Sequence, residues 1–368
     1  MIRILFLNHD LTCGGAERAL YGLLSKIDRS RFQPELWVRR AEGELREDYA
    51  KLKIPIRTVP SAMSEGARRR LLGKAAAAGA RMRFGRFDLV QSFCTNAWWT
   101  EPWAVALSGA RGYAMRKSDL YHHGPERSWR LRERRADRIV AVTREVSRRL
   151  YEGTPLQSKV RVILNGVDES RFVPRASNPL LRSELGVPAE AGLFACVASL
   201  SPYKGQIQLL VALAVAKGKG TPLHVAFVGR DIAAGEIQKW AAELGVADRA
   251  HFLGHREEIP AILAGCDGLV LTSPREGCSN AVLEAMSCGV PVVVSANGAE
   301  ELVEDGKDGF VVPVGEYGTL LDRLSRLAAD AALRKRLGEA ARQKVLEKFT
   351  LSRMARDYES LWEEMVES

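Results

Sequence analysis

The segment Ser273–Val294, SPREGCSNAVLEAMSCGVPVVV, gives the order loop, helix, strand and follows an apolar strand-like run. Ser279 is a good residue for the N-cap of the helix, Gly289 is a good residue for its end, and Pro291 follows shortly afterwards. Glu276 therefore lies just ahead of a helix N-terminus, and Glu284 lies within the helix. A strand, a loop, a helix and a second strand in this order are typical of a parallel α/β sheet.

The same alternation of strand-like and helix-like runs continues on both sides of this segment. The strand-like runs are residues 2–7, 35–38, 89–92, 138–142 and 160–163, and then 193–198, 224–228, 251–253, 268–271, 290–294 and 310–312. The two series predict two Rossmann-like domains with parallel sheets, 1–166 and 167–348, because 368 residues exceed one ordinary core. A helical pattern runs from Tyr317 to the end with an interruption near 349–351. In the last helix, 349–368, an apolar stripe (Met354, Tyr358, Leu361 and Met365) should dock onto protein, on the first domain.

The composition, with 46% hydrophobic and 27% charged residues, predicts a soluble globular protein. No run of 18 uncharged apolar residues occurs, so we expect no transmembrane helix. The first residues are expected to form a strand and not a secretory signal. The six cysteines contain no Cys-x-x-Cys pair, which favours reduced thiols over disulfides or a zinc site.

The net charge of +9 is unevenly distributed. Residues 1–170 contain 32 Lys and Arg against 19 Asp and Glu, whereas the remainder contains 22 against 26. This asymmetry indicates an anionic partner for the first half, either nucleic acid, an anionic membrane surface or a phosphorylated acceptor. No nucleic-acid recognition motif accompanies the charge, so we expect no nucleic acid. The basic stretches 67–86 and 127–149 are either solvated faces over a buried stripe or contacts with anionic lipid headgroups.

The loop and helix of the opening segment favour a site for a diphosphate. The amides at 279–282, including those of Ser279, Asn280 and Ala281, would attract an anion with the help of the helix dipole. A carboxylate beside an anion site needs a hydrogen-bond donor, and the hydroxyls of a sugar supply one. A single glutamate here would be an ordinary solvated residue, but Glu276 and Glu284 together around one helix cap favour a functional site.

Two further features point to phosphate. Pro-x-Lys-Gly follows the strand 193–198 and places Lys204 at the carboxyl edge of a sheet, where open α/β folds bind ligands. Lysine can neutralise a phosphate as a point charge. Gly14-Gly15 after the first strand, and Gly229 after the strand 224–228, allow the backbone to approach a ligand closely or simply form turns. No Gly-x-Gly-x-x-Gly dinucleotide motif is present.

Continued through Ser295–Val303 and Gly309–Pro313, the opening segment resembles the Glu-x7-Glu signature of retaining glycosyltransferases of the family 4 type. The resemblance implies a GT-B fold, with two Rossmann-like domains facing across a cleft. It implies that Glu276 contacts hydroxyls of the donor sugar, that Glu284 holds the ribose, and that Gly14 and Gly15 face the diphosphate. The remaining donor-binding residues that it implies are Gly229, Gly277, Ser279, Asn280 and Ala281.

The sequence departs from the family pattern at two places. An arginine usually stands where this chain has Ser199, so either Lys204 acts alone or Arg230 or Arg275 supplies the second charge. A histidine usually follows a strand in the middle of the first domain, whereas His122 and His123 come a few residues late. His122 is the candidate catalytic residue there, with Arg116 or Asp119 as alternatives. Trp98, Trp99 and Trp103 could form the base of a sugar-binding subsite, although packing in the core is the simpler explanation.

These residues predict transfer of a sugar from a nucleotide-sugar to a hydroxyl of a saccharide or glycolipid acceptor, with retention implied by the resemblance. We expect a role in cell-envelope polysaccharide or lipopolysaccharide assembly and a cytoplasmic, peripheral position on the inner face of the membrane. No cofactor or metal is expected, since the nucleotide-sugar is a substrate and no Asp-x-Asp motif occurs. The alternatives are a catalytically inactive nucleotide-sugar-binding protein, or an epimerase or phosphorylase, of the same fold.

Overall fold

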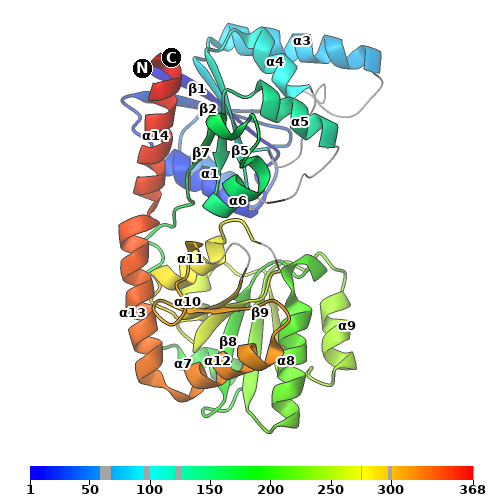
Figure 1. Ribbon diagram of the computed structural model, residues 1–368, viewed down its shortest axis with the longest axis vertical. Coiled ribbons are helices and arrows are strands. Elements are labelled where there is room, and N and C mark those ends of the chain that lie inside the picture. Colours follow the sequence, from blue (N-terminus) through cyan, green and yellow to red (C-terminus); the bar gives the residue numbers. More distant parts are fainter. Residues whose placement is uncertain are drawn as a thin grey trace. The chain divides into compact units, whose positions relative to one another are not determined.

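The structure is a computed structural model that describes residues 1–58, 68–94, 100–118, 120, 126–274, 276–296 and 301–367, with the backbone alone for 68–76. The chain divides into two compact units (Figure 1). The first unit contains Met1–Gly166 and Leu351–Ser368, and the second contains Val167–Thr350. Each unit is a Rossmann-like α/β domain with its own parallel sheet, which confirms the predicted fold class.

The sheet of the first unit has seven parallel strands in the order β3-β2-β1-β4-β5-β6-β7. The strands are β1 (Ile2–Asn8), β2 (Phe32–Val38), β3 (Ile56–Thr58), β4 (Leu89–Ser92), β5 (Gly112–Lys117), β6 (Arg138–Ala141) and β7 (Val160–Val162). The sequence pattern did not predict β3 or β5. Strand β3 is short and mostly exposed, and β5 ends in Arg116 and Lys117, whose charges interrupt the apolar pattern although both side chains are buried.

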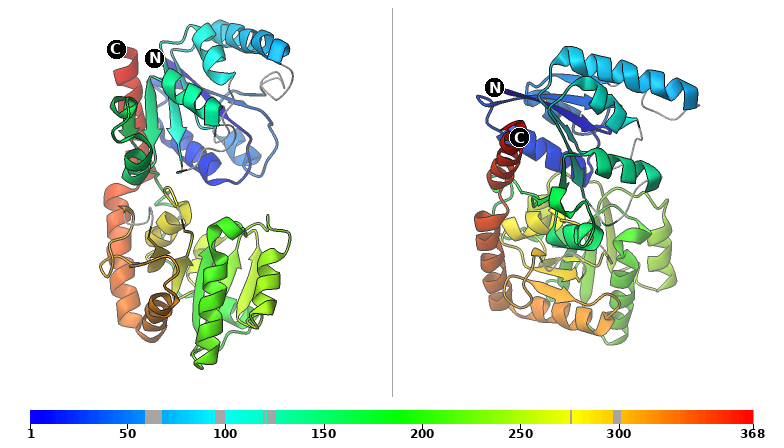
Figure 2. Two further views of the ribbon diagram at one scale, coloured as in Figure 1. Left: turned by 45° about the vertical axis from the view of Figure 1, so that its right-hand side comes forward. Right: turned by 45° about the horizontal axis from the view of Figure 1, so that its top comes forward.

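Helices cover both faces of this sheet (Figures 1 and 2). They are α1 (Gly15–Lys26), α2 (Arg46–Lys51), α3 (Arg68–Gly85), α4 (Glu101–Ser108), α5 (Glu126–Arg135), α6 (Arg144–Tyr151) and α14 (Leu351–Glu367). Alternate side chains of β1 divide between the two layers, because successive residues of a strand point to opposite faces. Ile4 and Phe6 join the core beneath α1 and α14, whereas Leu5 and Leu7 join the core beneath α3–α6.

The C-terminal helix α14 packs on the first unit, as its apolar stripe predicted. Met354, Tyr358, Leu361 and Met365 are all buried in the same core as α1. Trp362 is also buried there, its Nε1 donates a hydrogen bond to Oε1 of Gln91 at 3.1 Å, and its ring meets Phe6 edge-on. The chain therefore returns to its first unit after completing its second.

The second unit has six parallel strands in the order β10-β9-β8-β11-β12-β13. The strands are β8 (Gly192–Val197), β9 (Leu223–Val228), β10 (Ala250–Gly254), β11 (Gly268–Leu271), β12 (Val292–Ser295) and β13 (Phe310–Val312). The helices are α7 (Pro179–Glu184), α8 (Gln206–Gly218), α9 (Glu236–Glu243), α10 (Ile259–Leu263), α11 (Asn280–Ser287), α12 (Tyr317–Ala329) and α13 (Ala331–Lys348).

One helix boundary in this unit was not predicted. The helical pattern after Tyr317 is broken at Asp330, whose carboxylate accepts a hydrogen bond from the amide of Leu333 at 2.9 Å and caps α13. Apolar side chains of α8, α9 and α12 pack on one face of the sheet. On the other side of this unit, α11 lies against α13, where a Cβ atom on Gly338 would meet the carbonyl oxygen of Gly289 at 1.9 Å.

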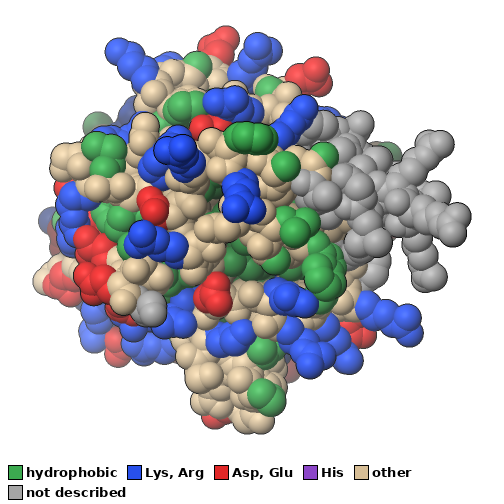
Figure 3. All heavy atoms as spheres, turned by 90° about the horizontal axis from the view of Figure 1, so that it is seen from above, with side chains coloured by type: hydrophobic (Ala, Val, Ile, Leu, Met, Phe, Trp, Pro, Cys, Tyr) green, Lys and Arg blue, Asp and Glu red, His purple; other side chains and the backbone are tan. Residues whose placement is uncertain are grey.

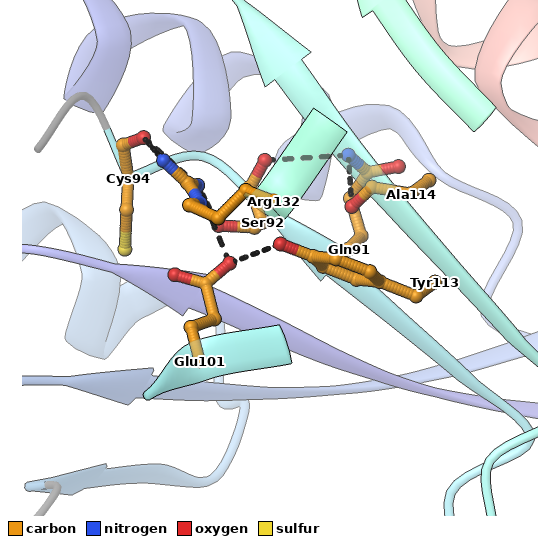
Figure 4. A network of polar contacts seen from close by, with 7 residues as sticks. All are labelled: Gln91, Ser92, Cys94, Glu101, Tyr113, Ala114 and Arg132. Carbon is orange, nitrogen blue, oxygen red and sulfur yellow. Dashed lines mark hydrogen bonds and ion pairs between the residues drawn. The ribbon is translucent and has the colours of Figure 1, made fainter. Parts of the chain in front are cut away.

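The basic stretch 127–149 is not a simple solvated face, because Arg132 from α5 is completely buried. Figure 4 shows its guanidinium beside the carboxylate of Glu101, at 3.3 Å, and it also donates to Ser92 Oγ and to the carbonyl of Cys94. The hydroxyl of Tyr113 donates to the same carboxylate at 2.6 Å. This buried network joins the end of β4 to α4, α5 and β5, and sequence reasoning missed it because its members are scattered along the chain.

Candidate functional site

The order of strands in the second unit creates a switch point between β8 and β11. From β8 the chain crosses to β9 on one side, whereas from β11 it crosses to β12 on the other. Open α/β sheets bind ligands outside the carboxyl ends of the strands at such a point. Lys204 comes from the loop that follows β8, and Glu276 comes from the loop that follows β11.

The loop after β8 is held against the loop after β11 by their backbones. Pro202–Lys204 form a single 3₁₀ turn (η3), and Gly205 then takes a left-handed conformation with φ of 68° before α8 begins. A Cβ atom on Gly205 would lie 2.2 Å from the carbonyl oxygen of Thr272. The hydroxyl of Thr272 donates back to the carbonyl of Gly205 at 2.8 Å. Only glycine fits at this contact, and the contact therefore fixes the backbone position of the preceding residue, Lys204.

Lys204 and Glu276 are brought together at this edge. The Nζ atom of Lys204 lies 2.9 Å from Oε1 of Glu276, and their side chains are 38% and 18% exposed. The buried thiol of Cys196 lies at the end of β8 near both charges, and burial raises its pKa to about 12. The ion pair is thus accessible from solvent on one side and closed by the end of the sheet on the other.

Helix α11 begins beside Glu276 with its first residues partly exposed. Ser279 occupies the N-cap, as predicted, but its side chain accepts no capping hydrogen bond, so the helix start depends on the backbone. Gly277 is buried, whereas Ser279, Asn280, Ala281 and Glu284 keep partial exposure. The helix ends at Ser287, and two residues later Gly289 takes a left-handed conformation with φ of 70°. The amides of Gly289 and Val290 donate to the carbonyls of Met286 and Ala285 and close the helix end.

Glu284 lies further along α11, in a different setting from Glu276. Burial, and next the charge of Glu284, raise the pKa of the Cys288 thiol to about 12. The carboxylate of Glu284 therefore lies near enough to Cys288 for the two groups to interact electrostatically. Glu276 and Glu284 thus precede and follow the start of one helix, the arrangement that the sequence predicted.

Gly229 follows β9, next to the end of β8. A Cβ atom on Gly229 would lie 2.0 Å from the carbonyl oxygen of Ala198, so the two strand ends touch through their backbones. The amide of Leu200 donates to the carbonyl of Arg230 at 2.8 Å. The backbone of Arg230 is therefore adjacent to that of Ser199 and Leu200, and both Ser199 and Arg230 are exposed. Arg275, the other candidate for a second cation, lies outside the described residues.

Gly14 and Gly15 lie in the first unit, at the start of α1. Gly14 is the N-cap with an extended backbone, and Gly15 is the first helical residue and exposed. The carboxylate of Glu17 folds back over Gly14, since a Cβ atom there would meet Glu17 Oε2 at 2.1 Å. Burial raises the pKa of Glu17. The position of Gly14 and Gly15 opposite a diphosphate stays a prediction.

The candidates for the acceptor side fall into two groups. His122, His123, Asp119, Trp98 and Trp99 lie outside the described residues. Arg116 is described and buried: it donates to Oδ1 of Asn165 at 2.9 Å, and its guanidinium lies over the ring of Phe93. Trp103 is not in the core: it lies on α4, is 38% exposed, and has the guanidinium of Arg135 over its ring.

Neither a metal-binding cluster nor a membrane-spanning helix occurs in the part of the chain that the structure describes. No three His, Cys, Asp or Glu side chains there are grouped so that they could hold a metal ion. No helix there is both long and apolar enough to cross a membrane. The six cysteines are all free thiols.

Comparisons with known families match both units. Residues 13–171 match the model described as Glycosyltransferase Family 4, and residues 177–344 match the model described as Glycosyl transferases group 1. The D-inositol 3-phosphate glycosyltransferase of Corynebacterium jeikeium is 30% identical over 287 residues, which cover 73% of this chain and 68% of that protein. The lipopolysaccharide core biosynthesis glycosyltransferase LpsE of Rhizobium meliloti is 27% identical over 218 residues, covering 59% and 61% of the two chains.

Among solved structures, the Anabaena protein HepE in complex with UDP and glucose is 25% identical, with a TM-score of 0.85 over 99% of this chain and 100% of that chain. The chain spans about half to two thirds of the length of the curated relatives that it matches.

Proposed function

The chain belongs to the family 4 glycosyltransferases, and we propose that it transfers a sugar from a nucleotide-sugar to a hydroxyl of an acceptor, with retention of the anomeric configuration. The observation that carries this proposal is the Lys204–Glu276 pair at the switch point of the second sheet. A cation for the leaving phosphate and a carboxylate for sugar hydroxyls lie side by side there, next to the start of α11. Sugar transfer needs both groups, whereas simple nucleotide binding needs only the first.

The leaving diphosphate is stabilised by positive charge and by oriented amides. Lys204 and the amides at the start of α11, near Asn280 and Ala281, supply both without a metal ion. These groups are in place before the glycosidic bond breaks, so they stabilise charge as it develops on the phosphate oxygen. The phosphate oxygen that leaves the sugar can itself accept the proton of the attacking hydroxyl.

The two glutamates divide the recognition of the donor between them. Glu276, next to Lys204, accepts hydrogen bonds from hydroxyls of the transferred sugar, and Glu284 accepts those of the ribose. Gly277 and Gly229 let the backbone approach the donor, and Gly14 and Gly15 are the donor-binding residues that we assign in the first unit. HepE binds UDP and glucose, which makes UDP-glucose the first donor to test on this chain.

The Lys204–Glu276 pair alone gives the site no spare positive charge for a diphosphate. We assign Arg230 as the second positive charge for the diphosphate, because its backbone lies directly beside Ser199 and its side chain is exposed. Arginine binds phosphate with two parallel hydrogen bonds, so a single side chain at the end of β9 is enough.

We place the acceptor among saccharides or glycolipids of the cell envelope, with His122 as the candidate catalytic residue of the first unit. LpsE acts by its name in lipopolysaccharide core biosynthesis, which favours such an acceptor. The excess of Lys and Arg in residues 1–170 favours contact with an anionic membrane surface and a peripheral position on its inner face.

The test combines binding and turnover. Calorimetry with UDP, GDP and ADP identifies the base, and release of UDP from UDP-glucose and other UDP-sugars then identifies the sugar. We expect Lys204→Ala and Glu276→Gln to lower turnover by at least about a hundredfold while the protein stays folded. Lys217→Ala is the matched control, because Lys217 also forms an ion pair on the second unit, with Asp248, but on the far part of α8. Full turnover in the Lys204 or Glu276 variant would refute the site.

A further inference from the structure

Tyr203 lies in the loop between β8 and α8, one position before Lys204. Its side chain is 85% exposed, more than any other large hydrophobic side chain in the described part of the second unit. Exposed apolar residues are common, and one of them alone indicates nothing. An aromatic ring in solvent beside the Lys204–Glu276 pair needs a separate explanation, because the donor binds there in the proposed reaction.

The backbone around Tyr203 is held in place on both sides. Ser201 is buried, and its Oγ accepts a hydrogen bond from the amide of Tyr203 at 3.4 Å. The amide of Ser201 donates to Oε1 of Gln206 at 3.4 Å, and Nε2 of Gln206 donates to the carbonyl of Ser199 at 2.9 Å. The side chain of Gln206 is completely buried. The ring of Tyr203 is therefore exposed on a fixed turn.

The turn also directs Tyr203 away from the neighbouring cation. Pro202 has a fixed φ, and the amide of Gly205 closes the turn by donating to the carbonyl of Pro202 at 3.3 Å. Three residues make one turn of a 3₁₀ helix, so the side chains of Tyr203 and Lys204 point about 120° apart. Lys204 contacts Glu276 while the ring of Tyr203 stays in solvent. Adjacent positions, with Cα atoms about 3.8 Å apart, thus present a cation and a flat apolar face.

A flat aromatic ring beside groups for phosphate and hydroxyls suits a sugar ring. A pyranose carries its hydroxyls around its edge, while the C–H bonds on a face of the ring form an apolar surface. That surface packs on an aromatic ring and buries apolar area of both partners. The hydroxyl of Tyr203 can also exchange a hydrogen bond with a hydroxyl at the edge of the sugar. An acyclic hydroxyl compound offers no such face.

The proposed reaction brings the acceptor close to Lys204. The bond between the sugar carbon and the phosphate oxygen breaks, the acceptor oxygen bonds to that carbon, and the proton of the acceptor moves to the phosphate oxygen. The attacking hydroxyl must therefore lie within hydrogen-bond reach of the phosphate group that Lys204 neutralises. The donor sugar is assigned to Glu276 and the ribose to Glu284, and the nucleobase lies at the far end of the donor. The ring that remains to be held is that of the acceptor.

We propose that Tyr203 binds the acceptor by stacking against a pyranose ring, and that it thereby selects a saccharide over an acyclic hydroxyl compound. This inference rests on the proposed function and deepens it, since it names the residue of the second unit that recognises the acceptor class.

Stacking differs from charge attraction in its response to salt. Figure 3 shows Lys and Arg side chains scattered over one face of the molecule. Attraction of an anionic acceptor to such charges would weaken as salt is raised, whereas the stacking of a neutral sugar on Tyr203 would not. Neutral methyl glycosides are therefore the probes that isolate the contribution of Tyr203.

The test uses the full chain with UDP-glucose, or with the donor that calorimetry identifies, and the methyl glycosides of glucose, galactose, mannose and N-acetylglucosamine. We expect at least one methyl glycoside to increase the release of UDP. For that glycoside, Tyr203→Ala should raise KM about tenfold, the effect of losing one buried face of an aromatic ring, while kcat and UDP affinity change by less than about twofold. Tyr203→Phe should stay within about threefold of the wild-type KM, and Tyr203→Leu should lie between Phe and Ala. The KM of the wild type should be the same at about 50 mM and about 500 mM salt.

Tyr317→Ala is the matched control, because Tyr317 is 36% exposed at the start of α12, after β13, and β13 lies three strands from β8 in the same sheet. Glycerol is the matched acceptor, since it has hydroxyls but no ring, and UDP release with glycerol should be equal in Tyr203→Ala and the wild type. The proposal is overturned if no methyl glycoside increases UDP release by a chain that binds UDP, or if Tyr203→Ala leaves KM unchanged. It is also overturned if Tyr203→Ala weakens UDP binding, because the ring would then hold the nucleotide. A chain that binds none of the nucleotides would instead reject the proposed function.

Discussion

In the second unit the ammonium group of Lys204 donates to the carboxylate of Glu276 across 2.9 Å, although 72 positions separate the two residues. The site therefore neutralises part of its own charge while no ligand is bound. A diphosphate must compete with Glu276 for Lys204, and the sugar hydroxyls then give Glu276 new partners. This exchange predicts opposite effects on UDP affinity when Lys204 and Glu276 are replaced.

Glu276→Gln should tighten the binding of UDP alone while it lowers turnover of the UDP-sugar. Removal of the carboxylate frees Lys204, and a half-exposed pair is worth up to about 1 kcal/mol, or roughly fivefold in affinity. Lys204→Ala should weaken UDP binding instead. Calorimetry with UDP measures both effects. If Glu276→Gln binds UDP more weakly than the wild type, Glu276 does not compete with the diphosphate for Lys204.

Gly205→Ala should damage both stability and nucleotide binding. The left-handed backbone and the contact with Thr272 each oppose a Cβ atom, and together they should cost about 2 kcal/mol or more. Gly220→Ala is the control, because Gly220 has a φ of 70° with no atom within 4 Å of the added Cβ. It should show the backbone cost alone, about 1 kcal/mol. Urea unfolding compares them, and equal losses would mean that the two loops are not held by this contact.

Arg230→Ala should weaken UDP binding by about tenfold, the usual effect of losing one hydrogen bond to a charged group. Ser199→Arg in that background should restore the affinity, because the backbones of Ser199 and Arg230 are adjacent. Arg249→Ala serves as a control, since Arg249 lies before β10 and donates to the carbonyl of Thr221. If Arg230→Ala binds UDP as tightly as the wild type, Arg230 is not the second cation, and Lys204 is the one candidate left among the described residues.

Arg132→Met should destabilise the first unit by about 3 kcal/mol or more, since it leaves the buried carboxylate of Glu101 without its cation. Glu101→Gln in the same chain should recover part of this loss, because a neutral amide needs no counter-charge and still accepts from Tyr113. A double-mutant cycle by urea unfolding measures the coupling. Additive losses would mean that the two side chains do not act as a pair.

The stability of the second unit should fall as the pH drops from about 7 to 5. His224 and His251 stack on adjacent strands with ring nitrogens 3.1 Å apart, and burial lowers the pKa of both imidazoles. The folded state therefore binds fewer protons than the unfolded state, so stability is complete above the unfolded pKa and lost as pH falls towards the folded one. Replacing both with Gln should flatten this slope, whereas His255→Gln, at an exposed site, should not.

Local patterns of the sequence predicted much of the fold. The start and end of α11 depend on residues close to each other in the chain, and so does the stripe on α14, because helix periodicity relates residues three and four positions apart. The strand-like runs of the second unit all became strands. Where local pattern and environment disagree, the prediction was incomplete: β5 carries two cations that only their buried surroundings accommodate, and Asp330 interrupts a helix with a cap inside a continuous apolar pattern.

The sequence by itself determined two α/β domains and the residue types that the candidate site contains, since both follow from short-range periodicity and from the chemistry of single side chains. Only the tertiary structure decided which of those residues meet. Strand order places the end of β8 beside the end of β11 and so joins Lys204 to Glu276, and helix packing buries Arg132 against Glu101 while it leaves Phe84 on the surface. Such contacts depend on how distant segments pack together, and no spacing along the chain encodes them.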